Sequence, residues 1–289
     1  MEEPELLTEE IAVENSSPTG GVISVWTLNR PDKLNALNSD SHMLIKKNCR
    51  LAEENPNIRC IIIKGSKPKK PIENKKPKPA SFAAGADISE FIDKKSYDVR
   101  PFFEDNAWES VWNLSKPTIA MVDGFALGGG LELALSCDIR IASTRSTFGQ
   151  PEINLGLIPG GGGSQRLCRL IGYGRTMEII LSGRMISANE SLEMGIVNKL
   201  LEPEELESTC INLAKEISRK SPYTIKVAKR AVRFALEMPF SKGIESERDA
   251  FVSLFDTKDK EIGVKSYFER TFLTAHKLYD DVNEYWGQS

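Results

Sequence analysis

The stretch FALGGGLELALSCD, residues 125–138, is the most informative part of the sequence for the fold. Three consecutive glycines, residues 128–130, lead directly into a run of helix-forming residues. Glycine permits close backbone approach to a ligand, and the first turn of a helix leaves N–H groups free to bind a negative oxygen. Glu132 falls within that first turn. Taken alone, it is compatible with two roles, a complement to the helix dipole or a catalytic acid.

Strands and helices are predicted to alternate around this stretch. The strand pattern occurs at GVISVWTL (21–28), IRCIIIK (58–64), TIAMV (118–122) and DIRIA (138–142). Helices are predicted at 39–55, capped by Ser39 or Asp40, and at 99–115, and a loop rich in proline and glycine at 148–163. This order predicts an α/β fold with crossover connections.

The C-terminal part of the chain changes in character after about residue 203. Helical periodicity predicts helices at 203–219, 222–237, 242–255 and 258–270. We therefore divide the chain into a core, residues 1–202, that carries the active site and a C-terminal helical region, residues 203–289. Within the core, residues 66–80 hold four prolines and six lysines, which predicts a solvated, flexible loop.

Composition argues against several classes of protein. A net charge of −3 over 289 residues gives no reason to expect nucleic acid binding, and no apolar run is long enough to span a membrane. The only histidines, His42 and His276, are expected in polar helical surroundings, which disfavours Ser-His-Asp hydrolysis and a histidine-rich metal site. Five scattered cysteines and an acidic N-terminal segment without signal features predict a cytoplasmic protein with reduced thiols.

Two further segments carry chemistry. FGQPEINLGLIPGGGGSQRL, residues 148–167, places Glu152 in a loop among apolar residues. Burial there would raise the pKa of Glu152 toward the range that is useful for proton transfer. SFAAGADISEF, residues 81–91, has small residues before a predicted helix start at Asp87, so that Ala86 can present a free backbone N–H.

In combination, segments 81–91, 117–138 and 148–171 resemble the core signature of the crotonase (enoyl-CoA hydratase/isomerase) superfamily. NRPDKLNAL (29–37) and LSGRMISANESLEMGIVNKL (181–200) resemble its N-terminal and later motifs, and the similarity runs from about residue 10 to 270. The resemblance implies a ββα spiral core with a C-terminal helical region that forms trimers. It also implies a homotrimer or a homohexamer built as a dimer of trimers.

The resemblance assigns roles to individual residues. Ala86 and Gly129 would form the backbone oxyanion hole, and Glu132 and Glu152 the catalytic pair. The remaining implied positions are Lys33, Ala84, Asp87, Ile88, Tyr267 and Arg270 for substrate and CoA binding, and Gln150, Trp108 and Trp112 for the acyl pocket or its support. Tyr267 and Arg270 differ in type from the Phe and Lys that are common in the family.

Because isomerases of the superfamily typically lack the first acid, the presence of both favours hydration. The implied enzyme is an enoyl-CoA hydratase / 3-hydroxyacyl-CoA dehydratase, a hydro-lyase of acyl-CoA and fatty acid metabolism. Its substrate would be a short-chain 2-enoyl-CoA such as crotonyl-CoA or acrylyl-CoA. No cofactor or metal is expected, since CoA is part of the substrate.

Three alternatives remain at this point. Two are enzymes on the same scaffold, an enoyl-CoA isomerase and an acyl-CoA thioester hydrolase. The third is a non-catalytic RNA-binding relative, for which the basic run Lys46, Lys47 and Arg50 in helix 39–55 is the only sequence feature. By the same resemblance, the lysines of loop 66–80 lie near the adenine and 3′-phosphate of CoA.

Overall fold

The computed structural model describes residues 4–13, 21–69 and 78–269, and its main feature is a pair of sheets. The large sheet has the order β1-β2-β3-β5-β7-β10, in which only β1 runs antiparallel to its neighbour. Its strands are β1 Leu6–Ala12, β2 Val22–Leu28, β3 Ile58–Gly65, β5 Thr118–Val122, β7 Ile139–Ser143 and β10 Lys199–Leu201. The small sheet contains β4 Ser81–Ala83, β6 Phe125–Leu127, β8 Thr147–Gly149 and β9 Met185–Ser187, in that order.

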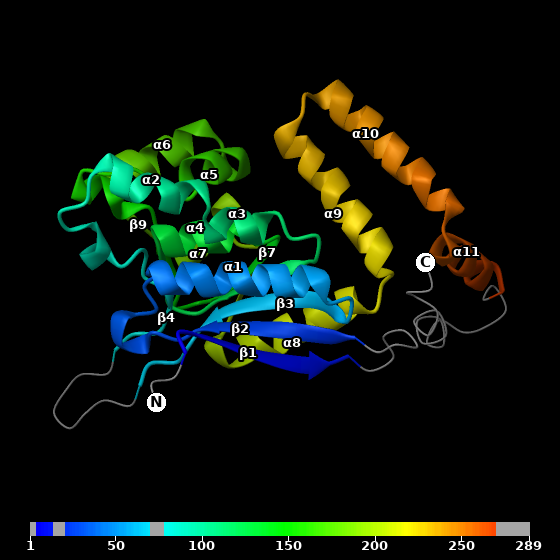
Figure 1. The fold of residues 1–289 in the computed structure, drawn as a ribbon, viewed down its shortest axis with the longest axis horizontal. Coiled ribbons are helices and arrows are strands. Elements are labelled where there is room, and N and C mark those ends of the chain that lie inside the picture. Colours follow the sequence, from blue (N-terminus) through cyan, green and yellow to red (C-terminus); the bar gives the residue numbers. More distant parts are fainter. Residues whose placement is uncertain (1–3, 14–20, 70–77, 270–289) are drawn as a thin grey trace.

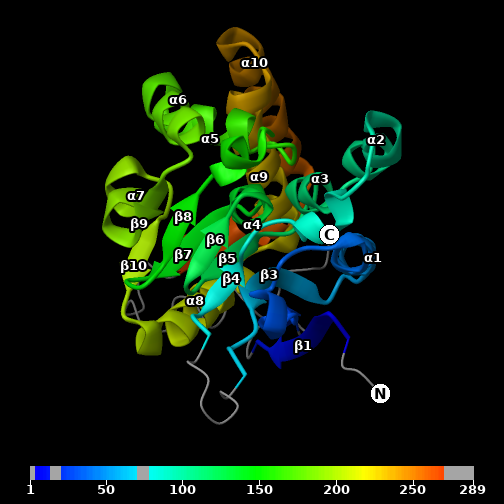
Figure 2. The same ribbon diagram turned by 90° about the vertical axis from the view of Figure 1, so that its left-hand side faces the viewer.

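Successive strand pairs build a spiral. β3 and β4, β5 and β6, and β7 and β8 each place one strand in the large sheet and the next in the small sheet, after which the chain turns into helical segments. Figure 2 shows the small sheet beside the central strands of the large one. This arrangement confirms the predicted α/β class and the ββα spiral.

Helices follow these strands and cover the sheets (Figure 1). The core helices are α1 Ser39–Glu54, α2 Ser96–Glu104, α3 Ala107–Trp112, α4 Gly129–Ser136, α5 Gly163–Ile171, α6 Tyr173–Ser182 and α7 Ala188–Met194. The later ones are α8 Pro203–Ser218, α9 Pro222–Glu237, α10 Phe240–Ser253 and α11 Lys258–Glu269. Single 3₁₀ turns are η1 Pro31–Lys33, η2 Ile88–Phe91, η3 Pro151–Leu155 and η4 Leu254–Asp256.

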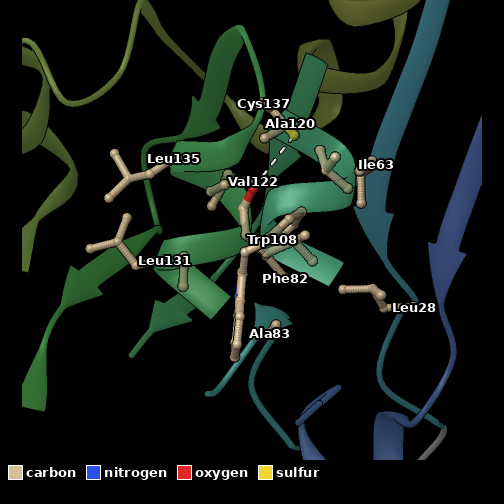
Figure 3. Close-up of a cluster of buried hydrophobic side chains, with 14 of the residues drawn as sticks. Leu28, Ile63, Phe82, Ala83, Trp108, Ala120, Val122, Leu131, Leu135 and Cys137 are labelled. Atoms are coloured by element: carbon tan, nitrogen blue, oxygen red, sulfur yellow. Dashed lines mark hydrogen bonds between the residues drawn. The ribbon is translucent and has the colours of Figure 1, made fainter. Parts of the chain in front are cut away.

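The two faces of the large sheet are buried separately. Along β3, Ile61 and Ile63 join the cluster between the sheets, whereas Cys60 and Ile62 join a second cluster on the opposite face. This alternation follows from the two-residue period of a strand. Figure 3 shows the first cluster, with Trp108 among its labelled side chains.

The C-terminal helices are not alike. Leu206, Cys210 and Ala214 of α8 belong to the second buried cluster, so that this helix closes a face of the sheet. By contrast, α9 and α10 bury no residue fully and extend away from the sheets as an antiparallel pair. The division at residue 203 stays a prediction, but the first helix after it is part of the core packing.

Several local predictions need correction. The predicted helix 99–115 is broken at Asp105 and Asn106, because the Asn106 side chain accepts a hydrogen bond from the Glu109 N–H at 2.8 Å and starts α3. Asn38, rather than Ser39 or Asp40, caps α1 by accepting from the Ser41 N–H at 2.9 Å. The strands β1, β4, β6, β8, β9 and β10 were not predicted, and the predicted loop 148–163 contains η3.

Within the described ranges, no helix has the length and apolarity that a membrane crossing requires. The same residues contain no group of His, Cys, Asp and Glu side chains arranged to hold a metal ion.

Candidate active site

The first predicted acid, Glu132, lies in the first turn of α4 and is only 2% exposed. Its Oε1 accepts hydrogen bonds from two backbone N–H groups, those of Gly161 at 2.7 Å and Gly163 at 2.8 Å. Both donors bind the same oxygen, so the second carboxylate oxygen, Oε2, receives no hydrogen bond from Gly161 or Gly163. A fixed, buried carboxylate in this setting differs from the solvated acid that merely complements a helix dipole.

The loop that holds Glu132 requires glycine. A Cβ on Gly161 would lie 2.4 Å from Cδ2 of the buried Trp108, and one on Gly163 would lie 2.5 Å from the side-chain amide of Gln150. Gly162 has a φ of +96°, which other residues rarely adopt. The run of four glycines, residues 160–163, is therefore explained by close packing around the carboxylate.

Opposing effects act on the pKa of Glu132. Burial raises it, while the N–H groups of Gly163 and Gly161 and the charge of Arg166 lower it. Burial prevails, so the pKa lies above its ordinary value. The backbone donors nevertheless favour the charged form of this carboxylate, as does the helix N-terminus on which it lies.

The second acid, Glu152, lies on η3 and is half-buried. Burial, together with the neighbouring charge of Glu132, raises its pKa to about 7. The side-chain amide of the fully buried Gln150, oriented with its nitrogen toward Glu152, donates to the two carboxylate oxygens at 2.8 and 3.1 Å. Burial therefore raises the pKa of Glu152, as the sequence predicted, and Gln150 orients the Glu152 carboxyl group.

The two predicted oxyanion-hole amides lie side by side. A Cβ on Gly129 would lie 3.4 Å from the Ala86 nitrogen, and a Cβ on Gly128 would lie 3.0 Å from Oε1 of Glu152. The Gly128 φ of +48° lets the chain turn from β6 into α4 at this point. The loop before α4 therefore contacts both the segment of Ala86 and the second acid.

This arrangement can perform proton transfer beside an oxygen that becomes negative. Adjacent backbone N–H groups can stabilise a developing oxyanion, and two acids with raised pKa values can exchange protons near neutral pH. Since the acids influence each other, they titrate as a pair.

The predicted tryptophans lie in different surroundings. Trp108 is buried, donates from Nε1 to the Gly129 carbonyl at 2.9 Å and stacks on Phe103 with ring centroids 5.8 Å apart. Trp112 instead faces α9, where its Nε1 donates to Oε1 of Glu237 at 3.2 Å. Trp108 therefore adjoins the oxyanion loop directly, and Trp112 lies one layer behind it.

The predicted CoA-binding residues are dispersed. Lys33 is exposed at the end of η1, and Ile88 is 56% exposed on η2. Ala84 donates its N–H to the Leu34 carbonyl at 3.0 Å. The Asp87 carboxylate is engaged by Arg30 at 2.8 Å and by Ser89 at 2.6 Å, which holds its pKa at about 2. Their part in CoA binding stays a prediction.

The late helix α11 carries Tyr267, which is 69% exposed and packs edge-on against Phe268, with ring centroids 5.7 Å apart. Arg270 lies outside the described residues, as does most of loop 66–80. The role of Tyr267 in CoA binding stays a prediction.

Two residues near the site were misjudged or missed from the sequence. His42 was expected in polar surroundings but is 3% exposed between the rings of Phe102 and Trp108, with centroids 4.4 and 4.5 Å away, and burial lowers its pKa to about 4. His276 lies outside the described residues. Arg166 was not singled out, although its charge acts on Glu132; the GGGGSQR run that contains it was the available signal.

Comparisons with known proteins agree with this geometry. The family model of enoyl-CoA hydratase/isomerase matches residues 19–273. The short-chain-enoyl-CoA hydratase of Clostridium acetobutylicum is 38% identical, covering 89% of this chain and 95% of its own. The crotonyl-CoA hydratase of Syntrophomonas wolfei is 36% identical, covering 86% and 92%. A solved enoyl-CoA hydratase of Bacillus anthracis superposes with a TM-score of 0.81 at 31% identity, covering 92% and 96%.

Proposed function

Because the chain belongs to the enoyl-CoA hydratase/isomerase family, we propose that it is an enoyl-CoA hydratase whose catalytic groups are Glu132 and Glu152. As a hydro-lyase, it adds water reversibly across the double bond of a 2-enoyl-CoA. The single observation that carries the assignment is geometric: the loop that leads into α4 and Glu132 contacts both the Ala86 nitrogen and the Glu152 carboxylate. An isomerase needs only one such acid.

The reaction moves two protons and one oxygen. The water oxygen bonds to C3, one water proton passes to ionised Glu132, and protonated Glu152 delivers its proton to C2. As water attacks C3, the π electrons of the C2=C3 bond shift toward the thioester carbonyl and form an enolate. The N–H groups of Ala86 and Gly129 stabilise the negative oxygen of this enolate until C2 is protonated. A single such donor is typically worth about 10²–10³ in rate.

The environments of the two acids support this division of roles. Glu132 receives two backbone hydrogen bonds and faces the charge of Arg166, which favour its ionised form. Glu152, with its pKa raised to about 7, holds a proton in a large part of the molecules at neutral pH. Gln150 keeps its carboxyl group in position.

For the substrate, we propose a short acyl chain such as crotonyl. Two relatives are named for short-chain-enoyl-CoA and crotonyl-CoA. The packed rings of Phe102, Phe103 and Trp108 beside the site support a restricted acyl pocket. CoA is bound as part of the substrate, and no further cofactor is proposed.

We also propose that the protein works as a homotrimer or a dimer of trimers, in the cytoplasm. The C-terminal helices support the association of subunits, since α10 and η4 expose large apolar side chains that an isolated chain would leave in water: Phe240 85%, Phe251 61%, Val252 58% and Phe255 53%. Mass measurement in solution tests this independently of activity.

The test of function is turnover of acyl-CoA thioesters from acrylyl- to decenoyl-CoA with product analysis. We expect 3-hydroxyacyl-CoA from the short members. Glu132→Gln and Glu152→Gln, which keep side-chain shape, should each reduce kcat by about 10²–10⁴ while the variants still bind crotonyl-CoA. The matched control is Glu193→Gln, an exposed acid on α7. Free CoA as product would instead indicate a hydrolase, double-bond migration an isomerase, and no turnover a binding protein.

A further inference from the structure

The guanidinium of Arg166 lies directly behind the glycine loop that holds Glu132. Its Nη1 donates to the Gly161 carbonyl oxygen at 2.6 Å. Gly162 makes room for it, because a Cβ there would fall 2.2 Å from the same nitrogen. Arg166 belongs to the first turn of α5, so that the loop and the arginine are placed by one continuous segment.

The position of this hydrogen bond within the backbone matters. The Gly161 carbonyl belongs to the peptide unit between residues 161 and 162, and the two N–H groups that bind Glu132 belong to the units on either side. Fixing the middle unit therefore limits the rotation of both flanking units, whose N–H groups lie 2.7 and 2.8 Å from Oε1. Arg166 thus acts on Glu132 through the backbone.

Arg166 is itself held by an aromatic side chain that faces α9. The Trp112 ring contacts two guanidinium groups, with its centroid 5.1 Å from Arg166 and 4.4 Å from Arg233 of α9. Its Nε1 donates to Glu237 of α9. Cation–π contacts of this kind stabilise the stacked geometry, most strongly when they are shielded from water.

We propose that Arg166 is a positioning residue for hydration, which orients the Gly161–Gly163 donors that hold Glu132, and that Trp112 makes this orientation depend on the docking of α9. The inference rests on the proposed function. It extends that function by connecting the C-terminal helical region to the catalytic carboxylate of the same chain.

The charges around this unit come from several elements. Glu132 faces Arg166 from α5, and it influences Glu152 of η3. Arg166 in turn faces Glu109 of α3, Arg233 of α9 and Cys137 at the end of α4, besides Glu132. Arg166 lowers the pKa of Glu132, so that its removal raises that pKa further.

The decisive experiment compares Arg166→Met and Arg166→Lys with the control Arg169→Met. Arg169 lies one turn further along α5, is exposed, and contacts α9 through the Leu236 carbonyl at 3.3 Å without contacting the glycine loop. For Arg166→Met we expect kcat on crotonyl-CoA to fall by about 10- to 100-fold, because small misplacements of catalytic groups have effects of this size. KM should change much less, and the acid limb of the pH–rate profile should move to higher pH.

Arg166→Lys should restore the acid limb to its wild-type position, because lysine keeps the positive charge. It should recover kcat only in part, because an ammonium group lacks the planar, fixed arrangement of N–H donors of a guanidinium. Arg169→Met should leave the profile in place. The proposal is overturned if Arg166→Met keeps the wild-type limb, including the case where it only lowers Tm.

Trp112→Leu tests the link to α9. It should lower kcat, but by less than Arg166→Met does. The double variant should have the same kcat as Arg166→Met alone. Additive losses would remove Trp112 from the proposal. If Glu132→Gln retains full activity, the proposed function fails; if it is inactive while Arg166→Met behaves as wild type, only the positioning role fails.

Discussion

The indole Nε1 of Trp108 donates a hydrogen bond to the Gly129 carbonyl oxygen at 2.9 Å, and thereby joins α3 to the first residue of α4. Trp108 is 1% exposed, so water does not compete for this bond. Because Gly129 supplies one of the proposed oxyanion donors, an aromatic side chain in the core fixes a catalytic backbone group.

Trp108→Phe keeps most of the ring but removes the donor. We expect kcat to fall by about 10-fold, somewhat less than the loss of a whole oxyanion donor, and the free energy of unfolding to fall by about 1–3 kcal/mol. The control is Trp26→Phe, which removes a buried indole donor to Ser24 Oγ within the large sheet. Trp26→Phe should lower the free energy of unfolding but leave kcat unchanged. An equal loss of kcat in both variants would contradict the role of Trp108.

Gly161→Ala should be among the most damaging single substitutions. The added methyl group would lie 2.4 Å from the Trp108 ring, which is buried and cannot swing away. The loop must then shift and carry its N–H away from Glu132, so we expect kcat to fall by about 10²-fold or more. Circular dichroism would establish that the variant is folded.

Gly174→Ala is the matched control, because an added Cβ on Gly174 of α6 meets no atom within 4 Å. It should leave kcat unchanged and stabilise the helix by about 0.5–1 kcal/mol. Wild-type activity of Gly161→Ala would mean that the glycine loop does not hold Glu132 in the working enzyme.

The sequence could predict those parts of the fold that depend on local patterns. The buried strand at 58–64 is recognisable because its isoleucines face clusters on both sides of the sheet, and α4 because glycines precede an apolar run. Six strands were not recognised, and all of them except β1 have only three residues. The three-residue strands β6, β8 and β9 are defined by pairing with distant partners, as in the contact of Phe148 with Ile186.

The same limit applies to the site. Glu132 and Glu152 are identifiable because each occurs in a distinctive glycine-bounded motif. Arg166 and His42 carry no local signal of this kind: Arg166 gains its role from the Gly161 carbonyl and Trp112, and His42 from rings on α2 and α3. A helical histidine among polar neighbours in sequence can still face the core, because only every third or fourth residue shares its face.

The pH profile of kcat/KM should be bell-shaped and the same in both directions. Water addition consumes no net proton, so the equilibrium constant does not depend on pH. Both directions require the Glu132/Glu152 pair to hold one proton in total. The alkaline limb should lie near pH 7, where Glu152 ionises. Initial rates with crotonyl-CoA over a pH series, for wild type and for Glu152→Gln, test this, and a wild-type profile without an alkaline limb near pH 7 would exclude Glu152 as the proton donor.

Glu152→Gln should change stability in a pH-dependent manner. The folded-state pKa of Glu152 is raised from 4.5 to about 7, so the folded protein holds this proton more tightly than the unfolded chain does. The stability gained from protonation is therefore complete below pH 4.5 and is lost as the pH rises to 7.

Removing the acid should make the variant more stable than wild type at pH 8, by about 1–2 kcal/mol once solvent screening is allowed for, with no gain at pH 4. Urea unfolding at both pH values measures the difference. Glu178→Gln is the control of opposite sign, because Arg184 lowers the pKa of that exposed carboxylate. A gain for Glu152→Gln that is equal at both pH values would show that burial of the charge is not its cause.

Phe103 should limit the length of the acyl chain. Its ring stacks on Trp108 and lies against the glycine loop, since a Cβ on Gly160 would fall 2.7 Å from Phe103 Cε1. α2, which carries Phe103, buries no residue fully, so that truncation opens space without collapse of the core. We expect Phe103→Ala to raise the ratio of kcat/KM for decenoyl-CoA to that for crotonyl-CoA by about 10-fold, the scale of a small change in an apolar pocket. Leu51→Ala on the exposed face of α1 should leave the ratio unchanged, and an equal loss across all chain lengths in Phe103→Ala would place the acyl chain elsewhere.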